Sequence, residues 1–183
     1  MQVTNHVVPK KRKTRNYTFR IDEELLDILF EEAKTQGINA NALMNKVLEQ
    51  YRVHGRNLKR FGIISMSRNV FSKIINCCTE DELKEIAKTV GSTEITDMLR
   101  AHGIRTEYNT VIEYVKSYGS IAGWFNSINH IEDTRNYMHL RHELGEKWST
   151  FLAEAATTMF KTLLDIEVET EQFETSVTIK LPN

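Results

Sequence analysis

Apolar and polar side chains alternate over residues 16–21, near the start of the chain. Tyr17, Phe19 and Ile21 share one side of this segment, and polar residues occupy the other. Such alternation predicts a strand with one apolar and one polar face. A strand this short cannot stand alone, because its backbone N–H and C=O groups need partners. A second copy of the chain, paired antiparallel, would supply them.

Two helices are predicted directly after this strand. Asp22 is suited to cap the first helix and Gly37 to end it, and Asn39 is suited to cap the second. Both helices carry apolar residues at helical spacing, at Leu25, Ile28, Leu29 and Ala33 in the first and at Ala40, Leu43, Val47 and Tyr51 in the second. The polar, basic residues 56–60 follow, and a domain boundary is predicted there.

Residues 61–183 have the pattern of a second, helix-rich domain. Residues 61–66 predict a short strand, with an extension of the preceding helix as the alternative. Ser67 predicts one helix start, and the capping-box pattern from Thr79 to Glu82 predicts another. Three glycines predict breaks in a run of short helices, at Gly91, Gly103 and Gly119.

The end of the chain mixes strands with one strongly amphipathic helix. Alternation predicts a strand over residues 135–142, and apolar residues at helical spacing predict a helix over residues 144–163. Residues 166–170 and 176–181 predict a β-hairpin. The second domain is therefore expected to be α+β and to end in a hairpin.

Charge is divided unevenly along the chain. Residues 1–60 carry 12 Lys and Arg against 7 Asp and Glu, whereas residues 61–183 carry 12 against 18. The net charge of −1 therefore hides a basic part and an acidic part. Residues 1–14 are basic and lack apolar periodicity, which predicts a flexible arm. This asymmetry indicates that the N-terminal part meets a polyanion.

The cysteines and the hydropathy pattern bear on the compartment. Cys77 and Cys78 are adjacent and form no CxxC motif, which favours a reducing setting. No apolar run reaches the roughly 18 residues of a membrane-spanning helix. The basic start is not followed by the apolar segment of a signal peptide. The sequence thus predicts a soluble, cytoplasmic protein.

One stretch, about residues 14–54, carries a family resemblance: TRNYTFRIDEELLDILFEEAKTQGINANALMNKVLEQY resembles the ribbon-helix-helix DNA-binding family of the methionine repressor and Arc. The features that match are the alternating strand, the Arg-Ile-Asp junction, the first helix, the Gly-Ile-Asn turn and the second helix. The resemblance implies a homodimeric domain over residues 15–55. Two strands would pair as an antiparallel ribbon that enters the DNA major groove.

The resemblance also implies which residues contact DNA. The polar face of the ribbon would read base edges through Asn16, Thr18 and Arg20. Their side chains suit this role, because Arg can bond guanine with both arms of its guanidinium group and Asn can both donate to and accept from adenine. The start of the second helix would hold a phosphate through exposed backbone N–H groups, at Asn39, Ala40 and Asn41.

The basic arm would add contacts to the DNA backbone. Its cations would bind phosphates in a salt-sensitive way, at Lys10, Lys11, Arg12, Lys13 and Arg15. The same run resembles a nuclear localisation signal, but the family is mainly prokaryotic, which favours the DNA-binding arm. Two plainer interpretations stay open. The alternating segment would be an edge strand of a single α+β domain, and the arm would be a solvated tail.

The second domain contains residues that invite a metal site. His139 and His142 are close in sequence, with Cys77, Cys78 and His130 as further candidate ligands. In a strand, however, the odd spacing of His139 and His142 places them on opposite faces. No acidic or cysteine spacing completes a recognisable site, so no metal is predicted. A structural His142 at a strand-to-helix junction is the favoured interpretation.

Other chemistry is equally open. Cys77 and Cys78 would be a redox switch between subunits or, as base rates favour, buried thiols. Trp148, Phe151 and Met159 would line a ligand pocket or, more often for such a stripe, belong to the core. No nucleophile elbow, P-loop, GxGxxG motif or carboxylate pair is present, so neither a catalytic residue nor a cofactor is predicted.

These observations favour a transcriptional regulator, most readily a repressor. The expected fold is α+β, with a ribbon-helix-helix dimer domain followed by an α+β domain over residues 61–183. Double-stranded DNA is the expected partner, bound by a homodimer or a dimer of dimers, and no membrane is involved. The second domain would mediate oligomerisation, bind a small-molecule effector or contact another protein. The alternatives are an antitoxin that neutralises a partner and a metal- or ligand-responsive sensor.

Overall fold

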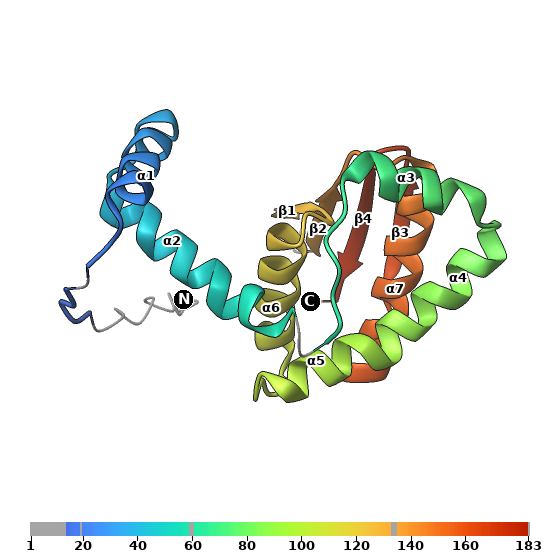
Figure 1. Cartoon of the computed structure of the whole chain (residues 1–183). Coiled ribbons are helices and arrows are strands. Elements are labelled where there is room, and N and C mark those ends of the chain that lie inside the picture. The colour runs from blue at the N-terminus through green and yellow to red at the C-terminus, as the bar shows by residue number, and fades with distance from the viewer. Residues whose placement is uncertain (1–13, 19, 59–60, 133–134, 183) are drawn as a thin grey trace, which may run out of the picture. The chain divides into compact units, whose positions relative to one another are not determined.

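The computed structural model describes residues 14–18, 20–58, 61–132 and 135–182. Figure 1 traces the chain and labels its elements. The chain forms two compact units, Met1–Leu48 and Glu49–Asn183. The division falls inside the second helix, whereas the sequence predicts a boundary at residues 56–60.

The first unit holds α1 (Glu23–Thr35) and most of α2 (Ala40–Val53). The side chain of Asp22 caps α1, as predicted, by accepting hydrogen bonds from the first turn. Gly37 follows α1 with a φ of 65°, a left-handed conformation that favours glycine, and backbone hydrogen bonds of the Schellman type close the helix end. The predicted pair of helices and the turn between them are confirmed.

The segment before α1 contains the predicted ribbon strand. Its described residues, 14–18 and 20–22, form no strand within the single chain. Phe19 lies outside the described residues, as do residues 1–13 of the predicted arm. Because the predicted ribbon pairs with a second copy, a single chain cannot display it. The ribbon therefore stays a prediction.

The second unit is mixed α+β, as predicted. Its elements follow the end of α2 in this order: η1 (Gly55–Asn57), α3 (Arg68–Cys77), α4 (Glu80–Thr89), η2 (Val90–Glu94), α5 (Ile95–Ala101), α6 (Tyr108–Ile121), β1 (Asn126–Glu132), β2 (Arg135–Arg141), α7 (Glu146–Leu164), β3 (Glu169–Phe173) and β4 (Ser176–Leu181). None of the helices described is both long and apolar enough to cross a membrane.

Four antiparallel strands form one sheet in the order β1-β2-β4-β3. Helix α7 packs against the sheet, and α4 packs against α7 on its other side (Figure 1). The core lies between these layers and includes the fully buried Trp148, Phe160 and Ile179. The predicted strand at 135–142, the long helix and a closing hairpin are confirmed, but the first strand of the hairpin lies at 169–173 and not at the predicted 166–170.

Helices α4 and α5 run into one another through η2, a single π-helical turn. Gly91 lies in this turn and is buried against α7. A Cβ atom at Gly91 would lie 2.5 Å from the carbonyl oxygen of Ala155. The prediction that Gly91 breaks a helix is therefore wrong, because this glycine serves close helix packing instead. Gly103 does end α5, with a φ of 64°, whereas Gly119 lies inside α6.

Two further expectations need correction, and one strand was missed. Residues 61–66 form neither strand nor helix in the structure, since a turn at Phe61 and Gly62 leads into an irregular segment. Its apolar residues Phe61, Ile63, Ile64 and Met66 line the apolar cleft described below. Cys77 is exposed and Cys78 is half-buried, so the pair is not a buried thiol cluster. Strand β1 was not predicted, because its sequence NSINHIE is mostly polar.

Candidate DNA-binding surface and apolar cleft

The residues predicted to read bases lie in the segment before α1. Asn16, Thr18 and Arg20 are all exposed in the single chain, and so is Arg15. Lys10, Lys11, Arg12 and Lys13 lie outside the described residues. The described polar side chains are thus accessible to a large ligand such as DNA.

The start of α2 has the features of an anion site. The Oδ1 atom of Asn39 accepts a hydrogen bond from the N–H of Ala42 at 2.8 Å, which caps the helix as predicted. The backbone N–H groups of Ala40 and Asn41 belong to the first turn, where a helix offers no internal acceptor. Together with the helix dipole, these groups favour a negatively charged partner.

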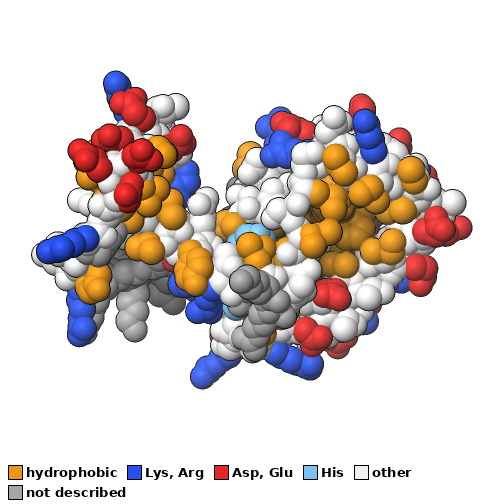
Figure 2. Space-filling view, viewed as in Figure 1, with side chains coloured by type: hydrophobic (Ala, Val, Ile, Leu, Met, Phe, Trp, Pro, Cys, Tyr) orange, Lys and Arg blue, Asp and Glu red, His pale blue; other side chains and the backbone are white. Residues whose placement is uncertain are grey.

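Apolar side chains remain exposed on the helices of the first unit. Figure 2 shows hydrophobic side chains gathered over α1 and α2. Six large hydrophobic side chains described on these two helices are exposed in the single chain, at Leu25, Ile28, Phe30, Val47, Leu48 and Tyr51. Among the described residues of this unit, only Ala33 and Leu43 are buried hydrophobics. The unit therefore lacks a full hydrophobic core of its own among its described residues.

The second unit contains a large apolar cleft. Its volume is about 870 Å³, and most of its lining is apolar. Figure 2 shows a hollow lined by hydrophobic side chains in this unit. The lining comes from the irregular segment 61–66 and from α4, η2, α5, α6, α7 and the sheet. At its deepest the cleft reaches core residues, which include Met138, Phe160 and Ile179.

Few polar groups face this cleft. His54 lies in its lining, and the Nδ1 atom of this histidine is buried without a hydrogen-bond partner. Tyr114 and Tyr118 also line it, and burial raises the pKa of both phenols, so that each remains protonated. The hydroxyl of Tyr114 lies 2.8 Å from Nδ1 of His102 and is therefore already hydrogen-bonded. Among the residues that the structure describes, the one buried side-chain polar atom without a partner belongs to His54.

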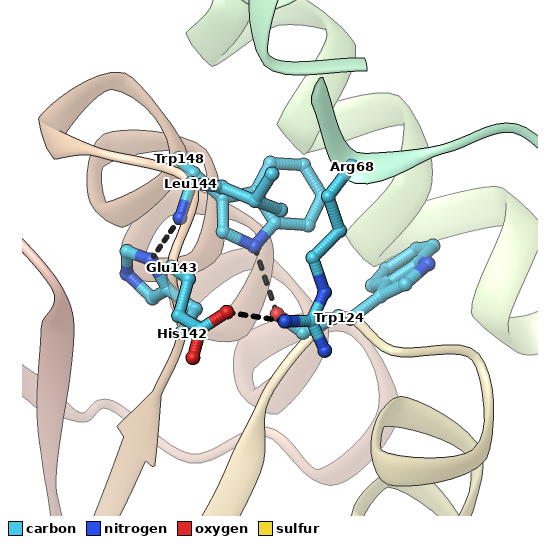
Figure 3. A network of polar contacts seen from close by, with 6 residues as sticks. All are labelled: Arg68, Trp124, His142, Glu143, Leu144 and Trp148. Atoms are coloured by element: carbon cyan, nitrogen blue, oxygen red, sulfur yellow. Dashed lines mark hydrogen bonds and ion pairs between the residues drawn. The ribbon is translucent and has the colours of Figure 1, made fainter. Parts of the chain in front are cut away.

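An ion pair lies at the edge of the cleft. Arg68, at the start of α3, pairs with Glu143, which lies between β2 and α7 (Figure 3). Trp124 is nearby, and its carbonyl oxygen accepts a hydrogen bond of 3.0 Å from the indole N–H of Trp148. Because Arg68 pairs with Glu143, the charged residues described at this edge include no unpaired cation for a ligand.

The residues Trp148, Phe151 and Met159 of α7 were predicted to line a ligand pocket or to belong to the core, and the structure shows both roles. Trp148 and Phe151 are buried in the core and do not line the cleft. Met159 is buried and does line it. Trp124, which the sequence analysis did not single out, lines the cleft from the loop after α6. A sequence offers no signal for this role, because the loop has no periodicity.

His142 is held at the junction between β2 and α7, as the favoured interpretation predicts. Its Nδ1 accepts the N–H of Leu144 at 3.3 Å (Figure 3), and its Nε2 lies 2.9 Å from Oγ of Ser149. Ser149 in turn donates to the carbonyl of Phe173. Because Nδ1 must accept, the ring is neutral, and burial lowers the pKa of His142 in agreement.

The other candidate metal ligands do not converge with His142. His139 and His130 stack, with Nε2 of His139 lying 2.7 Å from Nδ1 of His130. Burial, with a smaller effect of His130, lowers the pKa of His139. Within the described part of the chain, no group of three or more His, Cys, Asp or Glu is arranged to hold a metal ion.

No protein-family model matches the chain. A search of curated proteins finds no match either.

Proposed function

We propose that this chain is a homodimeric, sequence-specific DNA-binding transcriptional regulator, acting as a repressor. Two copies would pair their segments 16–21 as an antiparallel ribbon, which would enter the DNA major groove. One observation carries the proposal. The exposed polar residues Asn16, Thr18 and Arg20 precede two capped helices whose apolar side chains stay exposed in the single chain.

The exposed apolar side chains support a dimer. A soluble monomer rarely exposes a contiguous apolar patch, and such patches usually mark interfaces. The first unit exposes Leu25 and Ile28 on α1, and Val47 and Leu48 on α2. A second copy would cover these residues and, in the same step, provide the partner that the segment 16–21 needs. Both requirements are met by one symmetric dimer.

The start of α2 supports a phosphate contact beside the ribbon. Asn39 caps α2 by accepting from the N–H of Ala42, and the N–H groups of Ala40 and Asn41 face outward from the first turn. A phosphate there would be favoured by the helix dipole. Such contacts fix the position of a protein on the duplex but do not read its sequence. Base reading would therefore rest on Asn16, Thr18 and Arg20.

The charge distribution along the chain agrees with phosphate contacts by the N-terminal part. The chain up to residue 60 carries a net charge of +5, since its 12 basic residues exceed its 7 acidic residues by five. Two copies in a dimer would double this charge. Cations near the ribbon raise the affinity for any DNA duplex, and this contribution to affinity weakens as the salt concentration rises.

Selection from random double-stranded DNA tests the proposal. The full chain is incubated with the random pool at about 0.15 M salt, which weakens contacts that depend on phosphates alone, and bound fragments are sequenced. The proposal predicts an enriched motif with two half-sites, one for each copy. Recovery of fragments without any shared motif would contradict base reading, and recovery of none would contradict DNA binding itself.

A further inference from the structure

We infer that the apolar cleft of the second unit binds an uncharged, largely apolar small molecule whose single polar group bonds His54. The inference goes beyond the proposed function, because it concerns residues 49–183 and does not depend on DNA binding. It rests on the size of the cleft, its depth, its charge and the unpartnered nitrogen of His54.

The cleft is larger than packing defects in a protein core. Protein interiors are close-packed and contain few voids larger than one water molecule. Here a cleft of about 870 Å³ has a lining that includes the core residues Phe160 and Ile179. Ligand pockets of proteins commonly measure 300 to about 1,000 Å³ and are mostly apolar. The cleft therefore has the dimensions of a binding site.

The depth of the cleft favours a small molecule over a protein partner. Its walls come from separate elements, with Ile86 on α4, Met98 on α5 and Val115 on α6. Its deep end lies among side chains of the sheet and α7, such as Met138. A docked protein surface would cover the opening without filling this interior. A small apolar molecule would fill it and remove apolar surface from water.

The charges of the lining indicate that the ligand is neutral. Among the described lining residues the Lys, Arg, Asp and Glu side chains are Arg68 and Glu94, which have opposite signs. Arg68 is already paired with Glu143. Glu94 is exposed, so water screens its charge. An ionised ligand would therefore lose its hydration for at most a screened surface charge, which is unfavourable in an apolar site.

The one polar requirement of the ligand comes from His54. Its Nδ1 is the single buried side-chain nitrogen or oxygen without a partner among the described residues. A buried polar atom left unpaired costs free energy, and native proteins rarely retain one without a reason. A hydroxyl group can either donate to an imidazole nitrogen or accept from it, so it suits both tautomers of the ring. An apolar alcohol thus combines the features that the cleft selects.

The first measurement uses the fluorescent apolar probe N-phenyl-1-naphthylamine with the full chain. We expect a saturable rise in fluorescence with one site per chain, and displacement of the probe by 1-decanol. Ile86→Lys places a charge at the cleft and should weaken probe binding at least tenfold. Ile131→Lys is the matched control, because Ile131 is also exposed but lies on β1 away from the lining. The control should bind as the wild type does.

The second measurement isolates the polar contact. His54→Phe keeps an aromatic ring beside Tyr118, against which His54 packs edge to face, and removes the nitrogen. We expect this variant to bind the probe normally and to require about tenfold more 1-decanol for displacement. Equal displacement in the wild type and the variant would overturn the assignment to His54. No saturable probe binding by the wild type, or equal binding by Ile86→Lys, would overturn the cleft as a small-molecule site.

Discussion

Nε2 of His142 and Oγ of Ser149 lie 2.9 Å apart, and this contact joins the end of β2 to α7. The same imidazole accepts the N–H of Leu144 through Nδ1, so both ring nitrogens are used. The hydroxyl of Ser149 in turn donates a hydrogen bond to the carbonyl of Phe173 at the end of β3. One neutral histidine thus ties three elements around the start of α7.

Acidification should therefore destabilise the second unit. Burial lowers the folded-state pKa of His142, and that of His139 moves the same way. The unfolded chain then binds protons more readily than the folded chain, with a pKa of about 6.5 for an unperturbed histidine. The unfolding free energy should be highest above about pH 6.5 and fall as the pH drops below it. Urea denaturation at several pH values measures this.

The variant His142→Leu serves as the control. It should lower the unfolding free energy at pH 7.5 by about 1–3 kcal/mol, because the buried N–H of Leu144 loses its acceptor. It should also show a smaller loss of stability on acidification than the wild type. An unchanged pH dependence in this variant would contradict the role given to His142.

Gly91→Ala should destabilise the second unit. The added Cβ would lie 2.5 Å from the carbonyl oxygen of Ala155, so that η2 and α7 must move apart. Overpacking of this kind costs about 1–3 kcal/mol. Thr93→Ala, at an exposed position of the same turn, should change the unfolding free energy by less than about 0.5 kcal/mol. Thermal denaturation of both variants measures this difference in stability. Equal melting temperatures would contradict the close packing at Gly91.

Leu48→Lys should weaken the dimer. Leu48 is exposed in the single chain and belongs to the apolar surface that a second copy would cover. A charge buried there without a partner is unfavourable. Sedimentation equilibrium should show a dimeric wild type and a variant shifted toward monomer. Gln50→Lys adds the same charge at a neighbouring exposed position of α2 and should leave the dimer intact. A monomeric wild type would contradict the dimer outright.

Asn39→Asp separates helix capping from DNA binding. Aspartate caps a helix as well as asparagine does, so the unfolding free energy should stay unchanged. The new carboxylate would face the phosphate proposed to lie at the start of α2, and two like charges about 4 Å apart repel by about 1–4 kcal/mol in aqueous surroundings. DNA affinity should therefore fall. Asn39→Ser keeps the cap without the charge, and similar affinities for both variants would argue against a phosphate there.

Local patterns made much of the fold predictable. Asp22 and Thr79 were suited to cap helices and do so, and Gly37 ends α1 as expected. The strand at 135–142 could be predicted because its buried residues alternate with less buried ones, and the long helix because its apolar residues recur at helical spacing. These features depend on residues near one another in the sequence, where side-chain type and spacing act directly.

The cleft could not be predicted, because its walls come from distant parts of the chain. The role of Gly91 shows the same limit, since only the approach of α7 explains why a glycine lies inside a helix there. Strand β1 has a mostly polar sequence, with most of its residues exposed at the edge of the sheet, so its hydrophobic pattern is weak. The neutral state of His142 likewise depends on Ser149 and Leu144 in the folded protein.

The central claim is that the ribbon reads DNA sequence. The direct measurement is fluorescence anisotropy at about 0.15 M salt, with the selected duplex and a scrambled duplex of equal composition. Wild type is compared with the triple variant Asn16→Ala, Thr18→Ala and Arg20→Ala, whose fold is checked by circular dichroism. We predict that wild type prefers the selected duplex by at least a hundredfold, and that the triple variant binds both duplexes weakly and equally. A triple variant that keeps the preference of the wild type would contradict the account.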